Sequence, residues 1–521
     1  MSSHRARELA EAVAPEGRAR PVILTWLLLA GISGSLLLRA TLAPPPGTVF
    51  VGTNYFVGDF YNYLSYVQQA GDGALVFRNK LAPPTLPPVL VNVEWLLVGW
   101  LAKALGGSPL LAYHLLGFVA LLALVWLVDR WLVRGGLPPP RRLAGLLLVF
   151  TGGGLGGVLF AAGWLPGERA LDLRAGLFPF LEVVANPHFV FGTALLTAAL
   201  GAFAAGHPGR GVLLGNILAL ARPYDAALLV GVVGLATLLR WPVREWPRRL
   251  LPAAALVPVL AYDAWVFLFS PGYRIFSSEA YGTFGRLVPE LLIAVGPAAL
   301  VALTAMRLGD DDGPRRHRVY LALWAALAVT IAVLRPVSFS LQFLVGIGVP
   351  LLALGAIGLG RRRRGVLEAA VVVLAGTSMV VVWLLMHPLP GRYAPLDRWR
   401  LAAELRPVCR PGEVALSPPD IGLYVGAFTA CWPYVSHAVS PEHAVRDAAT
   451  RRFYAASPAD RRLFLDETCV SHVVVPGGWP NGGLPPEAPF RRRLLVEGPG
   501  DGLAVYSREA STPCRPAPDS P

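Results

Sequence analysis

The chain carries little charge for its length. Only 15% of its 521 residues are Asp, Glu, Lys or Arg, whereas 54% are hydrophobic and the mean hydropathy is +0.52. Soluble domains carry about a quarter charged residues, so this composition excludes a chain that is soluble throughout. Apolar runs of about twenty residues, each long enough to cross a bilayer, recur between Leu24 and Met386. The sequence therefore predicts a polytopic, all-α membrane protein.

Several signatures of cofactor chemistry are also absent. The sequence has no Cys/His spacing of a metal site, no Walker phosphate loop and no dinucleotide-binding fingerprint. The glycine-rich run 152–157 lies inside an apolar segment, where close helix packing explains it better than phosphate binding does. The sequence therefore names no cofactor and no metal ligand, and it leaves a divalent metal requirement open.

Cysteine is scarce and confined to one end of the chain. All four cysteines follow the last apolar run, namely Cys409, Cys431, Cys469 and Cys514. This placement suits an oxidising compartment and up to two disulfides in any of three connectivities, with buried unpaired thiols as the alternative. From residue 388 onward the composition is polar and rich in Pro and Arg. We therefore expect a small extracytoplasmic α/β domain over 388–521, with strands near 413–417 and 472–475 and helix within 441–465.

The net charge of +13 is distributed unevenly. Basic residues cluster in short loops between the apolar runs, around 130–142, 240–249, 315–318 and 361–364. Such clustering is typical of cytoplasmic loops, so we expect membrane lipids and no nucleic acid as partners. Residues 1–21, which are also basic, are predicted to be a cytoplasmic tail before a retained first span.

These basic loops indicate which segments cross the membrane. The N-terminus and the loop at 130–142 are both predicted to be cytoplasmic, so an even number of crossings must separate them. Three apolar segments lie between, at 22–42, 86–105 and 109–133. The segment 86–105 begins among prolines and carries Glu94 and Lys103, which are costly at mid-membrane depth. We expect it to be a juxtamembrane helix within an outer loop at 43–108.

The transmembrane domain is then predicted to span 22–387 with about eleven helices. The N-terminus is predicted inside and the C-terminus outside a bacterial inner membrane. The short pair 210–222 and 223–240 meets at Arg222, a pattern typical of a broken helix pair that lines a cavity. The remaining spans are expected at 143–164, 187–205, 249–269, 288–307, 318–334, 339–360 and 365–386.

Asp59 is the strongest candidate for chemistry. It opens an acidic, aromatic stretch in the predicted outer loop, and a helix would place Asp59, Tyr63 and Tyr66 on one face. Burial beside aromatic rings raises the pKa of a carboxyl, as a general base requires. The structural alternative is that Asp59 merely caps a helix.

Other polar residues of the predicted outer face are candidates for substrate binding. Arginines at the outer ends of spans can clamp a lipid phosphate, although anchoring to lipid headgroups explains them equally well. His188 follows Asn186-Pro187 and is a candidate for binding a phosphate or an acceptor, with helix capping as the alternative. The full candidate set comprises Tyr63, Tyr66, Lys80, His188, Arg222, Asp225, Arg274 and Arg335.

This arrangement resembles the GT-C superfamily of membrane glycosyltransferases, including bacterial polyprenyl-phosphate-mannose mannosyltransferase-like proteins. In that group an outer loop after the first span opens with Asp, followed by Tyr and Gly at spacings similar to Asp59, Tyr63 and Gly73. A Pro-Pro turn then leads to a juxtamembrane helix, similar to 79–105 here. Phe60 stands where the family usually has Glu, so the resemblance implies Glu94 as the second acid. The loop after Arg335 is also less basic than in related proteins.

The resemblance implies an inverting transfer of a sugar from a polyprenyl-phosphate donor. The acceptor would be a hydroxyl of a glycan, a lipid or a protein, with Asp59 as the base. Two other functions stay open at this point. A transporter or flippase of a lipid-linked glycan would place charged residues at mid-span, and a non-catalytic assembly protein would keep the fold while losing catalytic residues. The sugar itself is not indicated by the sequence.

Overall fold

The computed structural model describes residues 15–509, with gaps at 55–56, 83, 85, 175, 275–286, 309–311, 337–339, 363, 390, 438–441, 477–489 and 497–501. The chain forms two compact units. The first combines residues 1–38, 113–265 and 280–387, and the second combines 39–112, 266–279 and 388–521. The second unit therefore joins the predicted outer loop to the C-terminal region.

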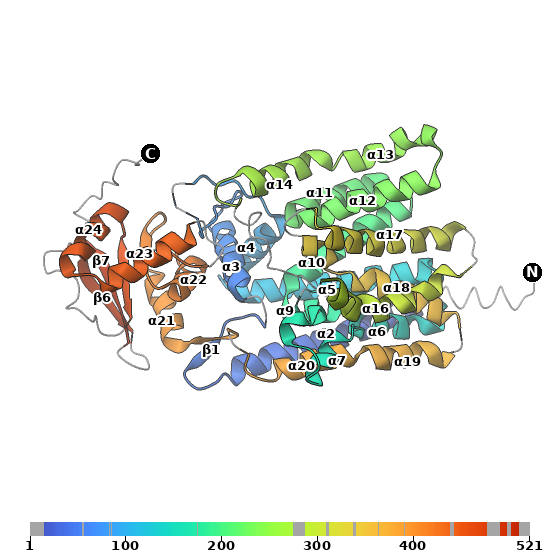
Figure 1. The fold of residues 1–521 in the computed structure, drawn as a ribbon, viewed down its shortest axis with the longest axis horizontal. Helices are drawn as coiled ribbons and strands as arrows, with labels where there is room; N and C mark the ends of the chain where they lie inside the picture. Colours follow the sequence, from blue (N-terminus) through green and yellow to red (C-terminus); the bar gives the residue numbers. More distant parts are fainter. Residues whose placement is uncertain are drawn as a thin grey trace, which may run out of the picture. The chain divides into compact units, whose positions relative to one another are not determined.

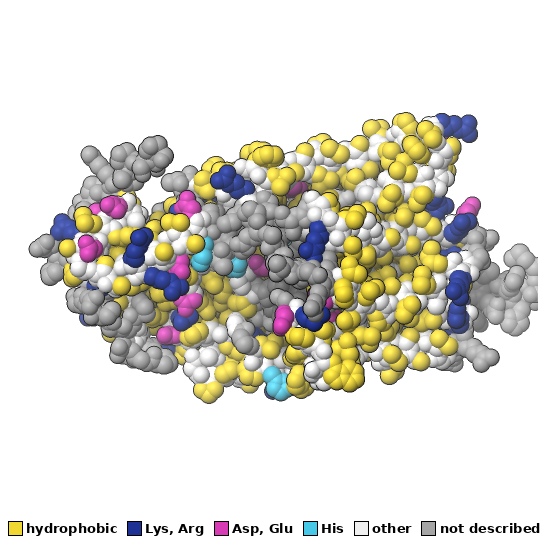
Figure 2. Space-filling view, in the orientation of Figure 1, with side chains coloured by type: hydrophobic (Ala, Val, Ile, Leu, Met, Phe, Trp, Pro, Cys, Tyr) yellow, Lys and Arg dark blue, Asp and Glu magenta, His cyan; other side chains and the backbone are white. Residues whose placement is uncertain are grey.

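The first unit is built from long helices that run roughly alongside one another (Figure 1). Apolar side chains cover much of the visible face of this unit, and Lys and Arg gather at one end (Figure 2). Its longer helices are α2 (Pro15–Leu42), α5 (Pro109–Arg134), α10 (Pro187–Ala204), α11 (Pro208–Ala221), α12 (Pro223–Arg240), α13 (Trp246–Ala254), α14 (Val257–Phe269), α16 (Leu287–Met306), α17 (Asp312–Leu334), α18 (Gly348–Gly360), α19 (Arg364–Leu374) and α20 (Gly376–Leu385).

Helix α18 forms the centre of this unit. All of its residues are buried, and it packs against α16, α17, α19 and α6 (Arg142–Thr151). Glycines allow the closest approach: a Cβ at Gly358 would lie 2.1 Å from Oγ1 of Thr304, and one at Gly355 would lie 2.7 Å from Cγ2 of Val301. Small residues at such crossings let helix backbones pack closely where lipid supplies no hydrophobic drive.

Among the described residues, eight helices are long and apolar enough to cross a membrane, or nine if the pair α13–α14, bent by 50°, counts as one span. The multi-pass prediction is therefore confirmed, whereas about eleven spans are not found. Helix α11 has 14 residues, too few to cross a bilayer, because Arg222 and Pro223 end it. The predicted span 143–164 is wrong, because the chain breaks after α6 and resumes as the short α7 (Gly156–Ala161).

Backbone contacts explain this break at the glycine-rich run. The amide of Gly153 donates to the carbonyl of Leu374 at 2.8 Å. A Cβ at Gly154 would lie 2.0 Å from the carbonyl oxygen of Ala294, so only glycine fits there. At the start of α7, the amide of Gly157 donates to Oδ2 of Asp172 at 3.2 Å. Close packing is therefore confirmed as the role of Gly153 and Gly154. The amide of Gly157 instead binds the Asp172 carboxylate at the N-terminus of α7.

The second unit contains a five-stranded mixed sheet in the order β4-β3-β5-β7-β6. Its strands are β3 (Val414–Leu416), β4 (Trp432–Pro433), β5 (His472–Pro476), β6 (Phe490–Val496) and β7 (Leu503–Arg508). Strand β3 runs parallel to β4 and β5, and β7 runs antiparallel to β5 and β6. The helices that follow the predicted C-terminal boundary are α21 (Leu396–Leu405), α22 (Pro419–Phe428), α23 (His443–Ala455) and α24 (Pro458–Thr468). The small α/β region is confirmed.

Two helices of the predicted outer loop complete this unit. They are α3 (Val57–Gly71) and α4 (Val93–Ala104), which pack against each other, and α3 also packs against α22. The predicted helix at 86–105 is thus present, though shorter. A two-stranded pairing of β1 (Thr48–Phe50) with β2 (Tyr393–Pro395) further joins the loop to the C-terminal region.

Candidate functional site

Helix α3 carries the candidate base in its first turn. Asp59 is the third residue of α3, so it does not occupy the N-cap position, and it is half-buried. Negative charge in a first helical turn is stabilised by the helix dipole. The helix is fixed by α4, where a Cβ at Gly99 would lie 2.7 Å from the carbonyl oxygen of Val67. The backbone that presents Asp59 is therefore held by close packing.

The two tyrosines of the predicted face both lie in aromatic contacts. The ring of Tyr63 stacks on Trp95 of α4, with centroids 4.5 Å apart. Tyr66 packs against Phe77 at 5.6 Å and accepts a hydrogen bond from Nδ2 of Asn62 at 3.4 Å. Burial raises the pKa of Tyr66 to about 12, so its hydroxyl stays neutral. Of the two, Tyr63 is the more exposed.

Glu94 lies in the first turn of α4 and is almost completely buried, with 1% of its surface exposed. The side chain of Asn92 caps the helix by accepting from the amides of Glu94 at 3.0 Å and Trp95 at 3.2 Å. Glu94 directly precedes Trp95, and the Trp95 ring stacks on Tyr63. Tyr63 lies one turn after Asp59 on α3. The helix pair α3–α4 therefore carries four predicted residues, namely Asp59, Tyr63, Tyr66 and Glu94.

Lys80 is buried and bonded to the backbone. Its Nζ donates to the carbonyls of Thr429 at 2.6 Å and Gly426 at 3.3 Å, at the C-terminal end of α22. A cation there complements the helix dipole and satisfies carbonyls that have no partner within the helix. Burial lowers the pKa of Lys80 to about 8. A donor phosphate could reach this ammonium only in competition with these carbonyl partners.

A histidine that the sequence reasoning missed lies against the start of α3. A Cβ at Gly58 would lie 2.4 Å from Nε2 of His437, so the imidazole occupies the space that any other side chain would need. Gly58 is the neighbour of Asp59, and both residues belong to the unit that contains His437. His437 follows β4, whose position is set by Gly422 of α22: a Cβ there would lie 2.0 Å from the carbonyl oxygen of Val435.

Two predicted residues of the first unit, Arg222 and Asp225, form a buried ion pair. Nε of Arg222 donates to Oδ2 of Asp225 at 2.8 Å, and these side chains are 4% and 1% exposed. The guanidinium also lies 4.9 Å from the ring centroid of Phe189. Gly192 of α10 leaves room for the pair, since a Cβ there would lie 2.0 Å from Cδ of Arg222.

Glu182, which is not among the candidates from the sequence, lies in the same electrostatic cluster. It belongs to the short helix α9 (Pro179–Ala185) and accepts from Oγ1 of Thr193 at 3.2 Å. Burial raises the pKa of Glu182 to about 8, against the opposing effect of Arg222. The charge of Arg222 therefore acts on two carboxyl groups, Asp225 through a direct ion pair and Glu182 through its electrostatic field.

His188, Arg274 and Arg335 are placed differently from one another. His188 is buried in the first turn of α10, where its backbone amide faces the hydroxyl of Tyr113 at 3.4 Å. Arg274 and Arg335 are both exposed. Arg335 follows the end of α17 with a φ of 50°. Arg274 comes two residues after Gly272, whose carbonyl accepts from Nδ2 of Asn79 at 2.6 Å. Arg335, His188, Arg222 and Asp225 belong to the first unit, and the other predicted site residues belong to the second.

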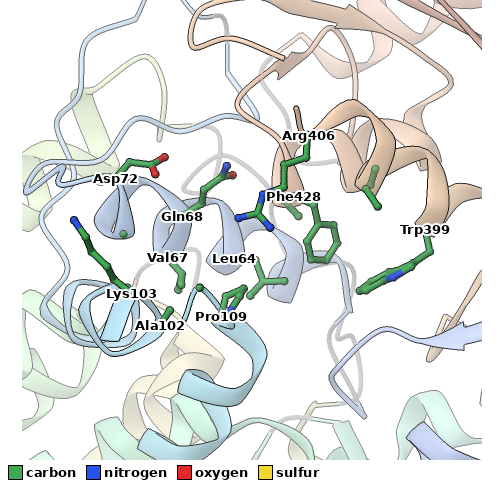
Figure 3. Close-up of a pocket in the computed structure, with 16 residues that line it drawn as sticks. Leu64, Val67, Gln68, Asp72, Ala102, Lys103, Pro109, Trp399, Arg406 and Phe428 are labelled. Carbon is green, nitrogen blue, oxygen red and sulfur yellow. The ribbon is translucent and has the colours of Figure 1, made fainter. Parts of the chain in front are cut away.

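The second unit also contains a cavity of about 360 Å³ beside α3. It is lined by α3 and α4 on one side and by α21 and α22 on the other, with Trp399 and Phe428 at one end (Figure 3). No residue of the predicted site lines it.

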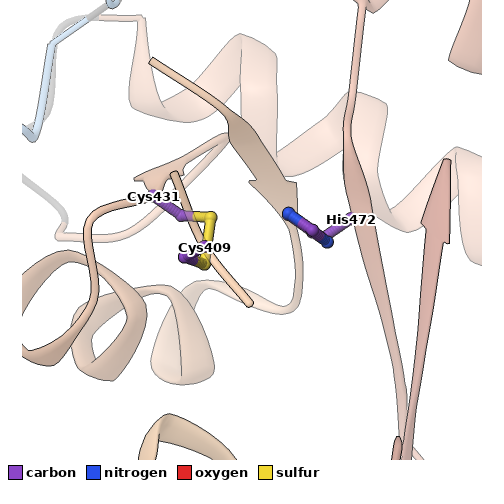
Figure 4. Close-up of side chains that lie close together, drawn as sticks. All are labelled: Cys409, Cys431 and His472. Atoms are coloured by element: carbon purple, nitrogen blue, oxygen red, sulfur yellow. A yellow bond between two sulfur atoms is a disulfide. The ribbon is translucent and has the colours of Figure 1, made fainter. Parts of the chain in front are cut away.

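One group of metal-ligating residue types lies in the sheet region. Cys409, Cys431 and His472 offer atoms within 4.8 Å of one another (Figure 4). The two sulfurs form a disulfide, so they offer no thiolate to a metal. His472 is held by Ser507 at 2.9 Å and by Glu413 at 3.0 Å. Cys469 is also disulfide-bonded, whereas Cys514 lies outside the described residues. Disulfide formation is therefore confirmed, and this cluster is structural.

Comparisons with known proteins agree on the fold. No protein-family profile and no curated protein sequence matches the chain. Among solved structures, arabinofuranosyltransferase AftD from Mycobacteria matches with a TM-score of 0.53 and 16% identity over 92% of this chain. The match spans 41% of AftD. ArnT from Cupriavidus metallidurans matches with a TM-score of 0.53 and 15% identity, over 94% of this chain and 98% of ArnT.

These neighbours are membrane glycosyltransferases with the GT-C fold, and this chain has that fold. The resemblance inferred from the Asp59 stretch is therefore confirmed at the level of architecture. An oligosaccharyltransferase from Archaeoglobus fulgidus is more distant, with a TM-score of 0.37 and 12% identity over 87% of this chain and 69% of that one.

Proposed function

We propose that the protein is a membrane glycosyltransferase that transfers a sugar from a polyprenyl-phosphate donor to a hydroxyl of a glycan, lipid or protein acceptor. The reaction takes place at the outer face of a bacterial inner membrane. The observation that carries this proposal is the half-buried carboxylate of Asp59 in the first turn of α3, where the preceding residue, Gly58, packs against the His437 imidazole. The shared fold with AftD and ArnT supports it.

The chemistry that suits this arrangement is a single inverting displacement. Asp59 takes the proton of the acceptor hydroxyl as its oxygen attacks the anomeric carbon. The bond from that carbon to the phosphate oxygen breaks on the opposite face, and polyprenyl phosphate leaves with the electron pair. Arg274, which is exposed and belongs to the same unit as Asp59, is the proposed phosphate contact.

His437 and Glu94 are proposed as positioning residues. The His437 imidazole occupies the space beside Gly58, so it fixes the first turn of α3, which carries Asp59. Glu94 supports Trp95 and, through it, the Tyr63 ring that borders the acceptor position. Neither residue needs to exchange a proton with the substrate.

The test is transfer from radiolabelled polyprenyl-phosphate sugars by the protein in nanodiscs. Asp59→Asn should lower kcat by about a hundredfold or more, since it removes the base. Glu404→Gln, an exposed carboxyl on α21, is the matched control and should keep full activity. Unchanged transfer by Asp59→Asn would remove Asp59 as the base. Failure of the wild-type protein with every donor would remove the glycosyltransferase proposal.

One residue keeps the transporter alternative open. Asp263 lies in the middle of α14, is 3% exposed, and has an Oδ2 that accepts no hydrogen bond from the part of the chain the structure describes. Buried carboxyls within spans mark proton or ion pathways in transporters. Uptake of a fluorescent lipid-linked glycan into proteoliposomes, abolished by Asp263→Asn, would favour this function over transfer.

A further inference from the structure

The cavity beside α3 has the size of a ligand site. Its volume of about 360 Å³ lies within the range of small-molecule pockets. Its walls come from two distant parts of the chain within one unit, α3 and α4 on one side and α21 and α22 on the other. The cavity is partly open to the surface, so a ligand can enter it from outside the protein.

Small side chains keep the cavity open. Ala102, Ala402, Ala403 and Ala427 line it together with Gly71, and none of them reaches across. Leu64 and Val67 of α3 add branched apolar surface. At one end the rings of Trp399 and Phe428 meet edge to face, with centroids 4.9 Å apart. The interior therefore suits an apolar chain.

Charge is restricted to the rim. In Figure 3, Arg406, Gln68 and Asp72 lie along one side of the cavity, while Leu64, Val67 and Pro109 lie along the other. Lys103 is a second cation at the rim. Both cations are exposed, and no ion pair within 4.0 Å is recorded for either among the described residues. With two cations and one carboxylate, the rim favours an anion.

The cavity faces away from the proposed base. Leu64, Val67 and Gln68 lie about a third of a turn around α3 from the stripe of Asp59, Tyr63 and Tyr66, at 3.6 residues per turn. A ligand here would contact a face of α3 that the transfer reaction does not use. The site is therefore separate from the proposed catalytic one.

We propose that this cavity binds an anionic amphiphile. Its alkyl chain lies between the alanines and the two aromatic rings, and its phosphate or carboxylate lies at the rim against Arg406. A glycan fits less well, because polar groups are available on one side only and hydroxyls facing Leu64, Val67 and the alanines would have no partner. The inference does not depend on glycosyl transfer.

The experiment measures competition for a photo-crosslinkable decyl phosphate. The protein is placed in phosphatidylcholine nanodiscs, and labelled peptides are identified by mass spectrometry. Label should fall on α3, α21 and α22. Alkyl phosphates of about six to twelve carbons should compete about fourfold better per added methylene until the cavity is full. Decyltrimethylammonium and decyl glucoside of equal chain length should compete at least tenfold more weakly.

Substitutions on α21 distinguish binding in the cavity from partition of the amphiphile into the bilayer. Ala403→Trp fills the space from an exposed position, and it should remove the label and the chain-length dependence. Glu404→Trp, its neighbour on α21 that does not line the cavity, should bind as wild type does. Arg406→Gln should weaken the phosphate about tenfold and leave the glucoside unchanged. Equal competition by all three head groups, or tighter binding of the glucoside, would overturn the proposal.

Discussion

The buried pair Arg222–Asp225 gives the sharpest test of whether the predicted residues of the first unit are structural or bind substrate. With exposures of 4% and 1% and a 2.8 Å contact, Asp225→Asn would leave a guanidinium buried without its charge partner. Breaking such a pair costs about 3–5 kcal/mol of unfolding free energy. The loss should appear as a fall of several degrees in the thermal midpoint of the protein in nanodiscs, followed by tryptophan fluorescence.

The size of this loss of stability depends on the protonation state of Glu182. Burial raises the pKa of Glu182, and repulsion from Asp225 raises it further, so removal of the Asp225 charge should lower the pKa of Glu182 and favour its ionisation near Arg222. The double variant Asp225→Asn/Glu182→Gln should therefore lose more stability than the two single variants combined, by about 1–3 kcal/mol of coupling. Glu182→Gln alone should be nearly silent at pH 6, where the wild-type carboxyl is already protonated.

The refuting result is simple to recognise. If Arg222 and Asp225 serve only to bind substrate, Asp225→Asn will leave the thermal midpoint unchanged and raise KM. Additive losses in the double variant would show that Glu182 does not interact electrostatically with this ion pair.

Three further results are expected. Gly58→Val should displace the His437 ring and lower the transfer rate about tenfold or more while α3 stays folded. Adding His437→Ala to this variant should recover part of the lost rate. No recovery would show that the contact with His437 is not the cause of the loss. Cys409→Ser/Cys431→Ser, which opens a loop with a sequence separation of 22, should cost about 3 kcal/mol in chemical unfolding, and no change in midpoint would contradict it. Burial lowers the pKa of Lys80 to about 8 in the folded protein, so between pH 8 and 10.5 the unfolded state binds more protons than the folded state. The contribution of Lys80 to the free energy of unfolding should therefore rise with pH in this range. Lys80→Met should abolish that rise when unfolding is measured as a function of pH.

Local patterns in the sequence predict much of the α3 region. The outer loop, its helices and the position of Asp59 follow from hydropathy, charge clusters and the spacing of aromatic residues, all of which act over a few turns. The broken segment after α6 could not be predicted this way. Its hydropathy suits a span, but Gly154 meets Ala294 and Gly153 meets Leu374, which are contacts between distant parts of the chain.

The same limit applies to the site. His437 has no motif around it, and only its position against Gly58 indicates a role. A glycine directly before a candidate acid was the one signal available. Glu182 was visible as an ionisable residue near a span, but its electrostatic interaction with Arg222 and Asp225 depends on how α9, α10 and α12 pack. Lys80 looks like a phosphate ligand until its two carbonyl partners are known.

The Lys80 contact also has a consequence for how the protein is made. Its carbonyl partner on Thr429 lies 349 residues further along the chain. At roughly 5–20 residues per second, the ribosome needs about 20–70 seconds to supply that partner after Lys80 has been synthesised. During this interval α3 and its loop are outside the ribosome without α22, His437 or the sheet. Until α22 is synthesised, α3 can pack only against elements made early, and α4 is the early neighbour that covers part of its surface.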